Sequence, residues 1–137
     1  MRPGAHWEQI ATSNPAFVTY QLSIRLREAQ SVTIGRLGRF DLPVGNYIYT
    51  GSARRNLVAR VKRHLRKDKS LRWHIDYLLA LKGAQVMDVQ LSDWSECEWN
   101  KNTTGEILVP GFGASDCKLG CISHLKYLGS EIQGVGQ

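Results

Sequence analysis

The stretch from Gly45 to Arg66 carries the residues with the most specific chemistry: a tyrosine-bearing strand, a glycine turn and a strongly basic helix. Backbone amides at the N-terminus of a helix attract anions, so this combination predicts a phosphate site. The chain has neither a Walker P-loop pattern nor a glycine-rich dinucleotide pattern, and no nucleotide cofactor is expected. A phosphodiester backbone is therefore the better candidate anion.

Positive charge is concentrated in and just after this stretch. The net charge is +6, and between Arg54 and Arg72 the basic residues are interrupted by one acidic residue, Asp68. Such a patch favours binding to a polyanion, with a merely solvated helix face as the alternative. The residues expected to contact nucleic acid are Arg54, Arg55, Lys62, Arg63, Arg66 and Lys67.

A helix is expected over about 56–67, because its apolar side chains recur with helical spacing. Arg60 and His64 are four residues apart and therefore neighbours on one flank, with His64 nearer the apolar stripe. Periodicity does not distinguish Arg60 from the other basic residues. Three basic side chains are expected to point outward: Arg63, Arg66 and Lys67.

Two strands should deliver tyrosines to this region. Apolar residues alternate from Val18 to Leu26, which predicts a half-buried strand with Tyr20 on its apolar side. Tyr47 and Tyr49 share one face of a second strand. A core aromatic is the commoner role for such a tyrosine, but a hydroxyl near a strand end can reach a cleft.

The remaining elements complete one small domain. Short strands are expected within 31–45, a buried helix over 71–82, a strand around 87–91, and a short helix capped by Ser95 and ending near Gly105. His74 and Asp76 are two residues apart and cannot form a dyad within one helix. The fold class is α/β (α+β), with a small mixed central sheet flanked by helices. The domain spans 1–137, with loose termini at about 1–14 and 129–137.

The cysteines and one histidine form a possible metal site. Cys97, Cys117, Cys121 and His124 have the count and types for a closed Cys₃His zinc site, and the last three lie near the usual spacing. Ordinary buried thiols are the alternative. An odd number of cysteines without an export signal argues against a disulfide framework. No apolar run could span a membrane, so a cytoplasmic protein without membrane partners is expected.

Several blocks, in order, resemble the GIY-YIG nuclease superfamily, and more closely its stand-alone Uri-type endonucleases. The blocks are GNYIYTGSA, Arg60-x-x-x-His64, WHIDYLL, Glu96-Cys97, PGFGASDC and SHLKYL. In this resemblance the first motif falls on 18–20, with Val18 where glycine is usual, and the second on 49–51. The chain has no clear match for the asparagine that this superfamily carries late in its sequence, and Ser115 or Asp116 could take its place.

The resemblance implies a metal-dependent endonuclease that hydrolyses DNA, in repair or processing. Mg²⁺ or Mn²⁺ would be held by Glu96 and waters, and Arg60 would offset charge developing on the phosphate. Tyr20 or Tyr49 would position or deprotonate the attacking water, with His64 as proton relay.

Two alternatives remain open from the sequence. One is a non-catalytic nucleic-acid-binding module on the same scaffold, and the other is a small interaction domain with a solvated basic face. The sequence does not fix the oligomeric state.

Overall fold

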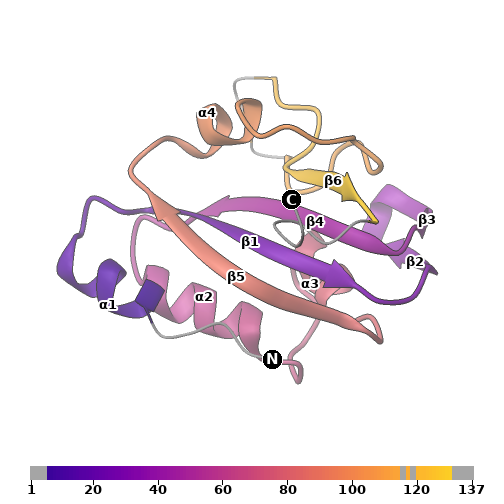
Figure 1. Cartoon of the computed structure of the whole chain (residues 1–137), viewed down its shortest axis with the longest axis horizontal. Helices are drawn as coiled ribbons and strands as arrows, with labels where there is room; N and C mark the ends of the chain where they lie inside the picture. Colours follow the sequence, from indigo (N-terminus) through magenta and orange to yellow (C-terminus); the bar gives the residue numbers. More distant parts are fainter. Residues whose placement is uncertain (1–5, 115–116, 118–119, 131–137) are drawn as a thin grey trace.

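A four-stranded antiparallel sheet with β1 near its centre organises the chain (Figure 1). Its order is β5 (Ala84–Ser92), β1 (Thr19–Leu26), β4 (Gly45–Ser52) and β6 (Leu125–Gly129). The computed structural model describes residues 6–114, 117 and 120–130. The register places Tyr20 opposite Gly51 on β4 and opposite Leu91 on β5.

Both faces of β1 are covered near its start. Tyr20, Leu22, Ile24 and Leu26 are buried in the main core, as the alternating pattern predicts. Gln21, on the opposite face, is also buried and donates hydrogen bonds to Thr50 (3.1 Å) and Thr103 (2.7 Å). The strand is therefore more than half-buried, because the segment after α4 (Glu96–Lys101) covers its polar side.

A separate hairpin spans 30–42, starting one residue before the region 31–45 in which short strands were expected. β2 (Gln30–Ile34) and β3 (Gly38–Leu42) pair antiparallel across a short 3₁₀ turn, η1 (Gly35–Leu37). Gly35 and Gly38 have φ angles of +49° and +113°, which other residues rarely adopt. Glycines at these two positions thus allow the tight connection between the strands.

The basic helix α2 (Leu57–Leu65) packs through the expected stripe, with Leu57 and Val61 buried. Helix α3 (His74–Leu79) starts later than expected, because Asp76 accepts the backbone N–H groups of Arg72 and Trp73, each at 2.8 Å. These bonds cap the helix in its first turn.

Residues within the expected loose N-terminus form a helix, α1 (His6–Ser13). Its Trp7 is 5% exposed, and the helix contacts β5 and α2. Figure 1 shows α1 and α2 side by side below the strands and α4 above them. Burial of Trp7 explains why this segment is ordered.

The expected α+β class is confirmed: the described residues form the antiparallel sheet, the hairpin and four α-helices. The expectation of a mixed sheet was wrong, because every described strand pair is antiparallel. In the part of the chain that the structure describes, no helix has the length and apolar character needed to cross a membrane.

Candidate active site and adjoining metal cluster

One cavity of about 610 Å³ gathers all five side chains that the sequence nominated for catalysis. β1 supplies Tyr20, β4 supplies Tyr49, α2 supplies Arg60 and His64, and α4 supplies Glu96. The rest of the described lining is Ser52, Arg72, Trp73, His74, Cys97, Gly113, Cys117 and His124.

Tyr20 and His64 form the buried centre of this cavity. The Tyr20 hydroxyl lies 2.8 Å from His64 Nε2, and the two residues are 1% and 2% exposed. The contact depends on Gly51, since a Cβ there would lie 2.6 Å from the Tyr20 hydroxyl oxygen and 3.0 Å from the Tyr49 ring. Gly51, within β4, therefore makes room for both tyrosines.

Burial sets the protonation states of these groups. Desolvation raises the pKa of Tyr20 and of Tyr49 well above 10, although the nearby Arg60 acts in the opposite direction. Burial lowers the pKa of His64 to about 4, against the opposing effect of Asp76. Near pH 7 the pair thus consists of a neutral imidazole and a protonated phenol.

Arg60 is held at the cavity by an aromatic platform that the sequence did not reveal. Its guanidinium carbon lies 4.6 Å from the centre of the Trp73 ring, and Nη1 donates to the Ser52 carbonyl at 3.3 Å. Arg63 and Arg72 also stack on Trp73, at 4.4 and 5.3 Å. Trp73, expected to be simply core, is half-buried and positions three cations.

Glu96 connects the cavity to a neighbouring cluster. Its Oε1 accepts a hydrogen bond from the Ser52 hydroxyl at 2.6 Å, and its Oε2 pairs with His124 Nδ1. Glu96 is the one carboxylate among the described residues that line the cavity, and its side chain is 25% exposed. No second carboxylate of the described lining therefore joins Glu96 as a ligand for a hard cation.

Of the six residues expected to contact nucleic acid, five are exposed and Arg63 is half-buried. Arg54, Arg55 and Arg66 are exposed. Lys62 is exposed and pairs with Glu8 at 3.1 Å.

The expectation that Arg63 points outward was wrong, and Lys67, although exposed as expected, also forms hydrogen bonds within the domain. Arg63 makes a two-point ion pair with the buried Asp76. Lys67 Nζ donates to the carbonyl oxygens of Leu79 (2.8 Å) and Ala84 (2.6 Å). Both cations therefore hold the domain together.

As their spacing predicted, His74 and Asp76 do not form a dyad. His74 Nδ1 accepts the backbone N–H of Gly113 at 2.9 Å, whereas Asp76 faces Arg63. The His74 contact holds Gly113 in the cavity lining beside Tyr49. A Cβ on Gly113 would lie 3.1 Å from the Tyr49 ring.

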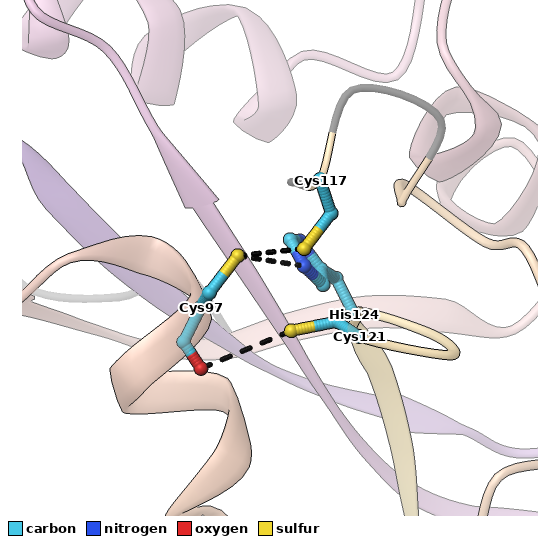
Figure 2. Close-up of side chains that lie close together, drawn as sticks. All are labelled: Cys97, Cys117, Cys121 and His124. Carbon is cyan, nitrogen blue, oxygen red and sulfur yellow. Dashed lines mark hydrogen bonds between the residues drawn. The ribbon is translucent and has the colours of Figure 1, made fainter. Parts of the chain in front are cut away.

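The four residues nominated for zinc do converge, and they could hold a metal ion such as zinc. The ligand atoms of Cys97, Cys117, Cys121 and His124 all lie within 4.8 Å of one another. Figure 2 shows Cys97 at the start of α4 facing the other three across a short gap. None of the three cysteines is in a disulfide.

Comparison with protein families corrects the resemblance drawn from the short sequence blocks. The family model that matches is described as domain of unknown function DUF123, and it covers residues 19–135. The GIY-YIG assignment was therefore wrong. Short blocks of tyrosine and glycine also meet the packing needs of two adjacent strands, as at Tyr20 and Gly51. Ser115 and Asp116 lie outside the described residues. Neither the curated proteins nor the solved structures gave a match.

Proposed function

The chain belongs to the DUF123 domain family, and for this member we propose a metal-dependent endonuclease that hydrolyses phosphodiester bonds of DNA. One observation carries the proposal: a hydrogen-bonded Tyr20–His64 pair, the stacked cation Arg60 and the carboxylate Glu96 line a single cavity. Phosphoryl transfer needs proton handling, stabilisation of negative charge and a position for a cation. The cavity offers a residue for each.

Arg60 would bind the scissile phosphate. Its guanidinium is oriented by the Trp73 ring and by the Ser52 carbonyl, so little reorganisation is needed when charge develops. Arg72, which also lines the cavity and stacks on Trp73, would add a second positive charge. These contacts would hold the phosphate near the Tyr20 hydroxyl.

Tyr20 and His64 would act as a proton relay. With His64 Nε2 accepting the Tyr20 O–H, the phenolic oxygen keeps a lone pair that can accept a hydrogen bond from water. As one water oxygen bonds to phosphorus, the P–O bond to the leaving DNA oxygen breaks, and a water proton passes to Tyr20 while the Tyr20 proton passes to His64. The leaving oxygen takes its proton from solvent water, and His64 then releases its extra proton to solvent. A neutral imidazole is required, and the lowered pKa of His64 supplies it near pH 7.

Glu96 would hold the divalent cation, Mg²⁺ or Mn²⁺. Each carboxylate oxygen has one protein partner, Ser52 or His124, and so retains a second lone pair. Magnesium commonly uses one or two carboxylates and keeps several waters, so the residues fit such an ion. The bound ion would supply positive charge that offsets the charge of the phosphate.

A DNA-binding module without hydrolysis is the second candidate. It is favoured by the raised pKa of Tyr20 and Tyr49 and by the contacts that already occupy Glu96. Such a module would use the same cavity and the exposed Arg54 and Arg55 to hold the backbone.

Cleavage assays on duplex, single-stranded and branched DNA with Mg²⁺ or Mn²⁺ separate the two candidates. For the nuclease we expect cleavage by the parent, a fall of about 10²- to 10³-fold in Arg60→Ala, and no change in Arg36→Ala. Arg36 is an exposed arginine of η1 outside the cavity lining. Salt-sensitive binding with no cleavage of any substrate would reject the nuclease and support the binding module.

A further inference from the structure

We propose that Cys97, Cys117, Cys121 and His124 bind one structural Zn²⁺, and that Glu96 is the outer partner that orients the histidine ligand. The inference does not depend on the proposed nuclease activity. It rests on the convergence of Cys97 of α4 with three ligand residues of the segment before β6, and on a separate contact at His124.

The ligand set has the size and chemistry of a closed zinc site. Tetrahedral ligands at zinc–sulfur distances of about 2.3 Å lie roughly 3.8 Å apart. The four ligand atoms lie within 4.8 Å of one another, and Cys97 Sγ lies 3.9 Å from His124 Nε2. The sulfurs of Cys97 and Cys117, 2.7 Å apart, would separate on binding. Three thiolates and one imidazole favour zinc over the hard cations.

His124 is already held as a metal ligand would be. Glu96 faces Nδ1 of the ring, which leaves Nε2 directed at the cysteine sulfurs (Figure 2). A histidine that binds metal commonly donates its other ring N–H to a carboxylate. Backbone hydrogen bonds to Phe112 (2.8 Å) and from Thr50 (3.0 Å) fix His124 further. Ordinary packing of three thiols would not require a histidine held between a carboxylate and the sulfurs.

A disulfide is the competing explanation for two of the cysteines. The distance of 2.7 Å between Cys97 and Cys117 exceeds the disulfide bond length of about 2.05 Å. A disulfide between them would also not explain why Cys121 and His124 lie so close to the same two sulfurs. Zinc uses all four side chains.

The metal would join α4 to the segment that leads into β6. All four protein ligands would be used, so no position remains open for a substrate, and the role is structural. Glu96, Cys97, Cys117 and His124 also line the cavity. The metal would therefore fix one cavity wall, including the position of Glu96.

Elemental analysis and cobalt substitution test the site on the whole chain, purified in reducing buffer without a metal-affinity tag. We expect about one zinc per chain. The cobalt-reconstituted protein should show thiolate-to-cobalt absorption in the near ultraviolet, and Cys121→Ala should weaken it. Zinc should protect the three thiols from alkylation until a chelator is added. This measurement uses the parent protein, so it does not depend on whether a variant folds.

A matched pair of variants tests the role of Glu96. Competition with a chromophoric chelator should show that Glu96→Gln weakens zinc binding by about 10- to 100-fold. Glu98→Gln changes an exposed carboxylate on the same helix and should leave the affinity unchanged. Parent protein that binds neither zinc nor cobalt after reduction overturns the site. Equal affinities of the two variants overturn the outer-partner role.

Discussion

Arg63 and Asp76 form a two-point ion pair between α2 and α3, with Nη1–Oδ1 at 2.9 Å and Nη2–Oδ2 at 3.0 Å. Asp76 is fully buried, and it also caps α3 through two backbone N–H groups. Burial alone would raise the pKa of Asp76, but the hydrogen bonds from Arg63, Trp73 and Arg72 outweigh it and lower the pKa. Arg63, which was expected to contact DNA, is therefore half-buried and pairs with a buried carboxylate.

Arg63→Ala should lower the free energy of unfolding by about 3–5 kcal/mol, because it leaves a buried carboxylate without its cation. Urea denaturation measures the loss. Arg66→Ala, an exposed arginine at the end of the same helix, should stay within about 0.5 kcal/mol of the parent. Similar small losses in both variants would mean that the pair contributes little.

Stability should fall as the pH drops from about 6.5 to about 4, because of His64. Burial lowers the pKa of this histidine from 6.5 to about 4, so in this window the unfolded chain binds a proton that the folded chain does not. The contribution is complete above pH 6.5 and is lost towards pH 4, by a few kcal/mol at most. Denaturation of His64→Gln across this range should show a flatter profile, whereas the exposed His6→Gln should follow the parent.

Gly51→Ala should disturb both tyrosines. The added Cβ would meet the Tyr20 hydroxyl oxygen at 2.6 Å, so we expect a loss of about 1–3 kcal/mol in stability. The Cβ would also meet the Tyr20 ring carbon Cζ at 2.7 Å. Tyr20→Leu removes both atoms, and the alanine should cost less in this background. A double-mutant cycle from urea denaturation measures the coupling, and strictly additive losses would contradict the proposed clash.

If the chain binds DNA as proposed, the affinity should depend on Arg54 and Arg55, which are exposed and lie between β4 and α2. Replacing both by alanine should reduce the slope of log affinity against log salt by about one for each phosphate that these arginines neutralise. Fluorescence anisotropy at several salt concentrations gives the slope, with Arg36→Ala as the control. An unchanged slope would place the DNA on another surface.

Local elements of the fold could be predicted because their signals lie within single segments. β1, β4 and α2 follow from alternation and helical spacing. Ser95 accepts the Glu98 N–H at 3.2 Å, as its capping position suggested, and its hydroxyl donates to the Glu98 side chain at 2.9 Å. Such features depend on neighbours a few residues apart.

Contacts between distant segments could not be predicted in the same way. Strand order requires Thr19 to pair with Ser92, and no local pattern encodes that choice. The ion pair of Arg63 depends on where α3 lies, and the role of Trp73 depends on three arginines that stack on one ring. The proposed catalytic residues were assembled largely from a family resemblance that the family comparison overturned, yet they line one cavity.

The central position of β1 also bears on how the chain folds. β1 pairs with β4, which follows after the short hairpin, but its other neighbour is β5, beyond both α2 and α3. Closing such long loops slows folding, since their entropy is lost before the contacts form. During synthesis β1 therefore waits with one edge unpaired until Ala84–Ser92 has emerged, and a nascent chain stalled before that point would expose a strand open to aggregation.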